Sequence, residues 1–553
     1  MGRIPSLRIS SHSFRDYTLI VVVLLSILLL AKFIVFYKDG ELDGHSAFYC
    51  NVDVNVNVDN DNSRPSEIAE AVAALTPTPK VKPAMEAERA REPGYCEYCT
   101  TKDDICKRYG TFNLARSRAY EGPNARLKRV LRKLSSGEKI KIGIIGGSVS
   151  GGHGLKDYHT NWSYLYAQYI RETFAPENVE LVELINGSVG ATVSDYMETC
   201  FLEHIPEDVD LVVIELAIND MRLEQLAMGY ENLIRAIFAL PNRPAVINLQ
   251  IMALMFSSIT MGGDLHTAVA QYYDTPIVSV RNVLLPHIFR STELNSSDTS
   301  VEDYWFHHNG GDIDLRHLGT NGHRILADLL ISFTSRVACE GWREEQQAAT
   351  QQHDIVGGFD WHPEGRIENG VTPSLPNPNE GSDVSEYIPR QSLFQQYDHA
   401  SVLLPAKPSC QIASPNAKHP LNPLPPPLST LGPDAFSLWS HPKNPGKVWL
   451  TARKPGVTVA FRVRTSAWGR VRVTYLRSES YGLGSVWCWV DEQREKGRRL
   501  DGWWQQKNIH VANTHNIAES ISPGEHILSC EILKETKDPG GGTEFRIVAV
   551  DAL

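Results

Sequence analysis

The chain has 553 residues, of which 42% are hydrophobic and 22% charged, so it has the balance of a globular protein and the length of two or three domains. Its formal net charge of −11 argues against a nucleic-acid partner, because proteins that bind nucleic acid present strongly basic surfaces. These averages conceal marked regional differences along the chain.

The first predicted element is a membrane-spanning helix at residues 17–37, an almost wholly apolar run that is long enough to cross a hydrocarbon core of about 30 Å. The run is longer than the core of a typical signal peptide and no small-residue cleavage site follows it, which favours an uncleaved anchor over a signal peptide or a buried helix. Three arginines precede it and acidic residues follow it, so the positive-inside rule keeps residues 1–16 in the cytosol. The sequence therefore predicts a single-pass type II membrane protein of the Golgi or secretory-pathway lumen, or of the cell surface.

Residues 38–93 are predicted to form a flexible stem, because this stretch is polar and rich in Asn, Asp and Pro. Beyond it, Asn161 and Asn295 lie in Asn-x-Ser sequons and are expected to carry glycans on the lumenal side. A third sequon, at Asn186, falls in the predicted active-site loop and is not expected to be modified.

Nine cysteines fit an oxidising compartment, although the odd number leaves one without a partner. Three of them, Cys96, Cys99 and Cys106, lack a fourth ligand at zinc-finger spacing, so disulfides are favoured over a metal site. Cys488 and Cys530 could pair with each other. No metal and no cofactor is expected anywhere in the chain.

Residues 94–340 are predicted to be the catalytic domain, with a helical lead-in over 94–137 followed by alternating strands and helices. Such alternation predicts a three-layer, doubly wound α/β/α fold with a buried parallel sheet. The expected strands are 139–145, 179–185, 211–216, 245–251 and 277–280, and the expected helices are 162–174, 192–203, 226–239, 264–273 and 319–337.

Four short motifs in this domain supply the groups needed for acyl transfer through a serine. Ser148 ends a Gly-Gly-Ser turn after the first strand, Gly190 follows the second, and Asn219 follows the third. Asp314 and His317 form an Asp-x-x-His pair in the loop before the last helix. Each motif alone has a simpler explanation, such as a turn or a helix N-cap. Their common position at the carboxyl ends of strands predicts that they meet in one crevice.

The chemistry explains these residue types. Ser148 is the predicted nucleophile, His317 the base that takes its proton, and Asp314 the carboxylate that orients the imidazole. The backbone N–H groups of Ser148 and Gly190 and the side-chain amide of Asn219 are the predicted oxyanion hole. Activity is expected to fall as His317 becomes protonated, near its ordinary pKa of about 6.5.

These motifs resemble the SGNH (GDSL-type) hydrolase superfamily, whose four blocks contribute Ser, Gly, Asn and His in the order of Ser148, Gly190, Asn219 and His317. The resemblance covers roughly residues 138–338 and implies a flavodoxin-like fold and a serine esterase activity. The first block here has Gly-Gly-Ser in place of Gly-Asp-Ser. The second block is one residue shorter than in many members, which leaves Gly187 as the alternative to Gly190. Five further histidines show no ligand spacing and are expected to be structural or solvent-facing: His153, His159, His307, His308 and His323.

Residues 341–434 are predicted to be a Pro-rich linker, partly ordered, and residues 435–553 an accessory β-sandwich of jelly-roll type, because short alternating runs recur at regular spacing. A fragment of about 94–410 is therefore expected to hydrolyse small esters on its own. Four tryptophans of the sandwich are candidates for a sugar-stacking platform, with core packing as the favoured alternative: Trp487, Trp489, Trp503 and Trp504.

Together these features predict an SGNH-type serine esterase that removes O-acyl groups, most of all O-acetyl groups, from a carbohydrate or glycan. Two alternatives remain open. One is a glycan O-acyltransferase with the same triad, in which a sugar hydroxyl replaces water. The other is a non-catalytic glycan-binding or scaffold protein that retains the fold.

Overall fold

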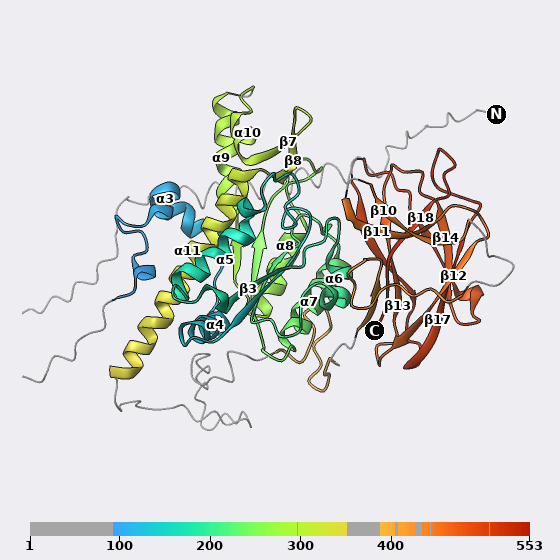
Figure 1. The fold of residues 1–553 in the computed structure, drawn as a ribbon, viewed down its shortest axis with the longest axis horizontal. Helices are drawn as coiled ribbons and strands as arrows, with labels where there is room; N and C mark the ends of the chain where they lie inside the picture. The colour runs from blue at the N-terminus through green and yellow to red at the C-terminus, as the bar shows by residue number, and fades with distance from the viewer. Residues whose placement is uncertain are drawn as a thin grey trace, which may run out of the picture. The chain divides into compact units, whose positions relative to one another are not determined.

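The computed structural model describes residues 92–295, 297–350, 388–403, 408–425, 434–442, 444–507 and 509–553. The predicted cytosolic tail, membrane anchor and most of the stem lie outside these residues, and so does much of the predicted linker. Among the described residues, no helix is both long enough and apolar enough to span a bilayer. Residues 90–553 form one compact unit, which contains an α/β domain and a β-sandwich (Figure 1).

A six-stranded sheet forms the centre of the α/β domain, in the order β1-β6-β5-β4-β2-β3. The neighbours from β3 to β6 pair in parallel, and β1 adds an antiparallel edge. Its strands are β1 (Arg118–Tyr120), β2 (Ile140–Gly146), β3 (Val182–Asn186), β4 (Leu211–Glu215), β5 (Ala245–Gln250) and β6 (Ile277–Ser279). The predicted doubly wound fold and its five parallel strands are confirmed, whereas β1 was not predicted.

Helices cover both faces of this sheet, as the near-continuous apolar strands require. One core packs α4, α5 and α11 against the sheet, and a second packs α6, α7 and α8 on the opposite face. The helices are α3 (Asp104–Ser117), α4 (Ala125–Ser135), α5 (Trp162–Phe174), α6 (Ser194–Cys200), α7 (Glu224–Phe238), α8 (Gly262–Tyr272), α9 (Arg281–Leu294), α10 (Ser300–Trp305) and α11 (Thr320–Thr350).

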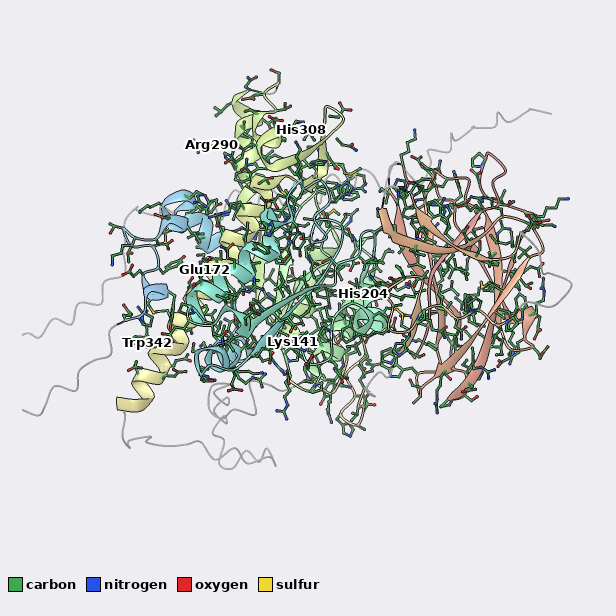
Figure 2. The ribbon with its side chains drawn as sticks, in the orientation of Figure 1. Lys141, Glu172, His204, Arg290, His308 and Trp342 are labelled. Atoms are coloured by element: carbon green, nitrogen blue, oxygen red, sulfur yellow. A yellow bond between two sulfur atoms is a disulfide. The ribbon has the colours of Figure 1, made fainter. Side chains whose placement is uncertain are left out.

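The histidine predicted to be catalytic lies on a two-stranded hairpin and not in a loop. The segment before α11 was expected to be a loop, but it forms β7 (Phe306–Asn309) and β8 (Asp312–Leu318). Asp314 and His317 both lie on β8. In Figure 2, His308 of this hairpin and Arg290 of α9 lie at the same end of the domain. The hairpin alternates weakly in hydrophobicity, which is why its sequence resembles a loop.

The β-sandwich has two antiparallel sheets, in the orders β10-β11-β18-β13-β16 and β12-β17-β14-β15, which confirms the predicted fold class. Its strands are β10 (Ser437–His441), β11 (Asn444–Ala452), β12 (Thr458–Thr465), β13 (Val471–Arg477), β14 (Ser485–Val490), β15 (Arg498–Asp501), β16 (Val511–Ala518), β17 (Gly524–Ile532) and β18 (Phe545–Ala552). β9 (Ser409–Ile412), from the predicted linker, pairs with β18 and so belongs to the first sheet.

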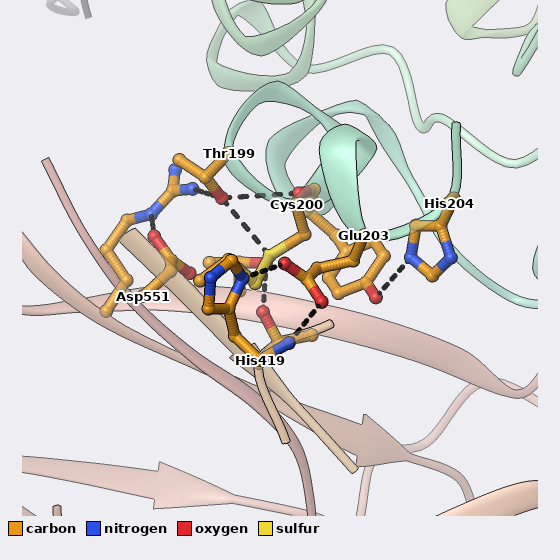
Figure 3. The surroundings of a disulfide bond; sticks show 11 residues. Thr199, Cys200, Glu203, His204, His419 and Asp551 are labelled. Atoms are coloured by element: carbon orange, nitrogen blue, oxygen red, sulfur yellow. Dashed lines mark hydrogen bonds and ion pairs between the residues drawn. A yellow bond between two sulfur atoms is a disulfide. The ribbon is translucent and has the colours of Figure 1, made fainter. Parts of the chain in front are cut away.

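The sandwich and the α/β domain are joined through α6 (Figure 3). Cys200 at the end of α6 forms a disulfide with Cys410 of β9. The guanidinium of Arg472 on β13 donates to Asp551 Oδ1 at 2.6 Å and forms an ion pair with Glu198 of α6. These charged side chains are at most 5% exposed. A buried charge is costly unless it is paired, so this junction holds the two parts in one arrangement.

Three further disulfides account for the remaining described cysteines: Cys96–Cys339, Cys99–Cys106 and Cys488–Cys530. The preference for disulfides over a metal site at the first cysteine cluster is confirmed, and so is the pairing of Cys488 with Cys530. Cys50, the ninth cysteine, lies outside the described residues.

Candidate active site

The predicted site residues meet where the strand order of the parallel sheet reverses. β2 has β3 on one side and β4 on the other, so the loops that leave these three strands diverge around a crevice. Ser148 follows β2, Gly190 follows β3 and Asn219 follows β4, and all three line the same cleft as Asp314 and His317.

Ser148, His317 and Asp314 form a continuous hydrogen-bonded relay. Ser148 Oγ lies 2.8 Å from His317 Nε2, and His317 Nδ1 lies 2.7 Å from Asp314 Oδ2. The other oxygen of Asp314 accepts the backbone N–H groups of Arg316 and His317, which holds the carboxylate in place on β8. This is the geometry in which a neutral imidazole takes a proton from a serine hydroxyl.

Burial and hydrogen bonding determine the charge states of His317 and Asp314. It lowers the pKa of His317 to about 4, even though the hydrogen bond with Asp314 works in the opposite direction. Burial also favours a higher pKa for Asp314, but the hydrogen bond and charge of His317 outweigh it, so the pKa of this carboxyl lies below its ordinary value. At neutral pH the site therefore combines an uncharged base with an ionised carboxylate.

Two backbone N–H groups are available beside the nucleophile. Within the described residues, neither the Ser148 nor the Gly190 N–H donates to another protein atom. A Cβ added to Gly190 would lie 3.5 Å from Ser148 Cβ, so the two residues are in contact. Gly187, the alternative, donates its N–H to the Ile144 carbonyl and packs against His204. The geometry favours Gly190 over Gly187 as the oxyanion donor.

The Asn219 amide is the third predicted donor, and its position explains the unusual first motif. Its Nδ2 donates one hydrogen to the Thr192 carbonyl at 2.7 Å, which leaves the second N–H. A Cβ at Gly147 would come within 2.2 Å of this nitrogen. The middle residue of the motif therefore has no room for the aspartate of the Gly-Asp-Ser pattern while Asn219 keeps this place.

Two buried carboxylates support the loops of the site, and neither was among the predicted site residues. Glu215, at the end of β4, accepts the Ser150 hydroxyl at 2.8 Å behind the nucleophile turn, and burial raises its pKa to about 7. Asp220 accepts the first N–H of α6, from Ser194, at 2.8 Å and lies 2.7 Å from His266 Nε2. The Asn219–Asp220 pair thus braces the loop that contains Gly190 and does not cap α7.

The cleft has a volume of about 1110 Å³ and is lined by both parts of the molecule. The sandwich contributes Lys447, Trp504, Gln506 and His510. The sandwich also contacts the loop of residues 187–193, which contains Gly190 and is called the oxyanion loop below. The Ala512 N–H of β16 donates to the Ala191 carbonyl of this loop at 2.8 Å. Contributions of this kind depend on tertiary packing and carry no local sequence motif.

The four predicted tryptophans do not form one platform. Trp504 is 8% exposed, packs with Val193 and Leu226 of the α/β domain, and lines the cleft. Trp487 and Trp489 lie on β14, in the sheet β12-β17-β14-β15. Both lie beside Arg494, whose guanidinium is 4.8 Å from the Trp489 ring. The core-packing alternative describes Trp504, although one of its surfaces is open to the cleft.

One of the five further histidines, His153, belongs to the site. Its ring centroid lies 4.2 Å from that of His317, and His153, Asp314 and His317 could together offer ligand atoms to a metal ion. Both ring nitrogens of His317 already contact Ser148 and Asp314, so a metal would have to displace one of them. His323 is fully buried and accepts a backbone N–H from Trp162, as a structural histidine does.

The predicted glycan at Asn161 is incompatible with the packing. Asn161 is fully buried, its Nδ2 donates to the Ser150 carbonyl, and its oxygen caps α5. A glycan on this nitrogen would break the contact next to the nucleophile turn. Asn295 is exposed at the end of α9, and glycosylation there stays a prediction.

No family model matches the chain, and no curated protein does. Among solved structures, a two-domain esterase (CEX) active on acetylated mannans matches with a TM-score of 0.51 and 18% identity, over 79% of this chain and 98% of that one. The structure of a two-domain esterase (CEX) co-crystallised with mannopentaose matches with a TM-score of 0.51 and 16% identity, over 79% of this chain and 97% of that one. A family 2 carbohydrate esterase with a carbohydrate-binding domain from Corynascus thermopiles reaches a TM-score of 0.26 at 12% identity, over 36% and 67%. The chain thus shares the overall fold of this two-domain esterase.

Proposed function

We propose that this chain is an SGNH-type serine esterase that hydrolyses O-acyl esters, most of all O-acetyl esters, on a carbohydrate or glycan. The observation that carries the proposal is the relay from Ser148 through His317 to Asp314, with contacts of 2.8 and 2.7 Å. Beside it lie two backbone N–H groups that donate to no other atom of the described residues. The fold of esterases that act on acetylated mannans supports the substrate class.

In this mechanism the Ser148 oxygen attacks the ester carbonyl carbon while His317 Nε2 takes the hydroxyl proton. The oxyanion accepts hydrogen bonds from the N–H groups of Ser148 and Gly190 and from the Asn219 amide. His317 then protonates the departing sugar oxygen, which leaves an acyl group on Ser148. A water molecule, deprotonated by the same imidazole, hydrolyses that acyl group and restores the free serine.

A fluorophosphonate probe tests the nucleophile directly, with acetate release from acetylated glycans as the activity readout. We expect labelling of the wild type and none of Ser148→Ala, whose kcat should fall by about 10⁴-fold or more. Ser257, an exposed serine of the same cleft, provides the matched control, since Ser257→Ala should be labelled normally.

Three results would redirect the proposal. Full turnover by both Ser148→Ala and His317→Ala would mean that the site is misassigned. Faster acyl transfer to an added sugar than to water would favour the O-acyltransferase alternative. Absence of labelling together with retained glycan binding would favour a non-catalytic binding protein.

For the location, the proposal is a type II anchor at residues 17–37 that places the esterase in the secretory-pathway lumen or outside the cell. The charge asymmetry around that segment supports it. In sealed microsomes we expect the esterase to be protected from added protease and Asn295→Gln to remove one glycan. Digestion of the esterase by protease added outside the sealed microsomes would show that the orientation is the opposite of the proposed one.

A further inference from the structure

A second cavity opens beside the active-site cleft and shares four of its lining residues: Gly190, Ala191, Lys447 and His510. This cavity has a volume of about 500 Å³ and lies between the oxyanion loop and the first sheet of the sandwich. A ligand that reacts at Ser148 can therefore extend past Gly190 into it. A substrate with several sugar units would reach both spaces.

Aromatic rings form one wall of the second cavity. Trp439 on β10 and Trp449 on β11 are cross-strand partners whose ring centroids are 5.2 Å apart, with an angle of 16° between the rings. The guanidinium of Arg546 lies 5.1 and 5.0 Å from these two rings and fixes their orientation. Flat apolar surfaces flanked by polar groups suit the faces and hydroxyls of pyranose rings.

The junction of the two cavities is positively charged. Lys447 is exposed there and forms no ion pair or hydrogen bond within the described part of the chain. Its charge acts together with that of Arg316 on His153 and His510, and after burial these charges help to lower the pKa of both histidines. Arg222, which is also exposed and without an ion pair among the described residues, lines the cleft as well.

Few acidic side chains are available to neutralise these cations. Of the three aspartates that line the cleft, Asp314 is bonded to His317, Asp220 is buried against Ser194 and His266, and only Asp312 is exposed. Glu479 lies near enough to His510 to influence it. This local surplus of positive charge contrasts with the chain's net charge of −11.

We infer that the substrate is an acidic glycan, in which Lys447 at the junction of the two cavities pairs with the carboxylate of a uronic acid residue next to the acylated sugar. The inference rests on the proposed esterase function and specifies its substrate. A single ammonium group without a partner among the described residues matches the single charge of a uronate. Because Lys447 is exposed, salt should weaken the pairing.

The test compares acetate release from an acetylated, glucuronic-acid-containing oligosaccharide with release from the same compound after its carboxyl groups are reduced to alcohols. For the wild type we expect kcat/KM to be about tenfold higher on the carboxylate form at low salt, an effect of the size expected for one hydrogen bond to a charged group. Lys447→Gln should reduce the ratio to near one, and Lys447→Arg should restore most of it. Lys534→Gln, at an exposed lysine that lines neither cavity, should keep the full ratio.

Equal rates of the wild type on the two oligosaccharides, or an unchanged ratio in Lys447→Gln, would overturn the inference. Hydrolysis of 4-nitrophenyl acetate by the wild type, measured in parallel, separates a failure of the acidic-glycan inference from a failure of the proposed esterase function. If this ester is cleaved and the ratio is one, only the acidic-glycan inference fails. If neither the ester nor either oligosaccharide is cleaved, the proposed function fails and the inference fails with it.

Discussion

The α/β domain and the sandwich contribute to the same cleft in different ways. In the α/β domain, the reacting groups lie on loops at the carboxyl ends of parallel strands and on the β7–β8 hairpin. In the sandwich, Lys447 lies within strand β11, and Trp504 and His510 lie in the segment between β15 and β16. In the proposed mechanism the first set performs the chemistry, whereas the second lines the space beside it.

The sandwich is therefore structurally part of the candidate active site. Cys410, Ile412 and Ala549 belong to the same core cluster as α6 and α7, and β16 donates a hydrogen bond to the oxyanion loop. The expectation that a fragment of about 94–410 works alone is therefore replaced by the opposite expectation. Without the sandwich, Glu198 would lose its buried cationic partner and this core would face water.

The largest expected effect is on the junction between the two regions. Arg472→Ala leaves Glu198 and Asp551 buried without their cation, which should lower the free energy of unfolding by about 3–5 kcal/mol. Thermal or urea denaturation measures the loss. The control is Arg462→Ala, which removes an exposed pair with Glu525 and should cost only about 0.2–1 kcal/mol. Similar losses in the two variants would show that the junction does not depend on the buried charges.

The next effect sharpens the role of the α/β loops. Asn219→Ala removes one oxyanion donor and the hydrogen bond to Thr192, so kcat should fall by about 10²–10³-fold. Steady-state kinetics on a soluble ester checks this. Asn219→Asp keeps the volume but has no N–H, and it should lose a comparable factor. An aspartate variant with wild-type kcat would remove Asn219 from the oxyanion hole.

The pH dependence of activity distinguishes the lowered pKa of His317 in the structure from the ordinary pKa expected from the sequence. An imidazole with a pKa of about 4 stays neutral as the pH falls below 6, so kcat/KM should hold down to pH 5 and decline near pH 4. With the ordinary pKa of about 6.5, roughly 30-fold of the activity would already be lost at pH 5. A pH–rate profile on an uncharged ester distinguishes the two. Decline centred near 6.5 would mean that burial does not control His317.

The smallest effect concerns Gly190. Its φ is not in the left-handed region, and an added Cβ would meet Ser148 Cβ at 3.5 Å, an ordinary contact. Gly190→Ala should therefore fold normally and lower kcat/KM by only about 2- to 10-fold, because the N–H is retained. Gly147→Ala is the contrasting variant, since its Cβ would come within 2.2 Å of Asn219. Equal losses in the two variants would show that the Asn219 contact is unimportant.

The fold of the α/β domain was predictable because its strands are buried on both faces and form short apolar runs. The same runs locate Ser148, Gly190 and Asn219, since parallel strands bring their carboxyl ends together. The Asp-x-x-His spacing identified Asp314 and His317, but not the hairpin that holds them. The catalytic roles of these residues stay predictions until they are measured.

What the sequence did not reveal depends on contacts between distant segments. Glu215 looks like part of a strand, and only the packing of β4 behind the nucleophile turn relates it to the site. Lys447 and His153 stand in unremarkable local sequence, and only the packing of the sandwich against the α/β domain places both in the lining of one cleft. The burial of Asn161 was hidden for the same reason, because a sequon says nothing about the packing of its side chain.

The Cys200–Cys410 disulfide has a topological consequence. Residues 351–387 lie between these two cysteines, so the bond closes that part of the chain into a covalent ring. A single cut inside the ring opens it without dividing the molecule, and the sandwich stays attached to the α/β domain. Once the bond has formed, the peptide between residues 351 and 387 is no longer needed to keep the two walls of the cleft together.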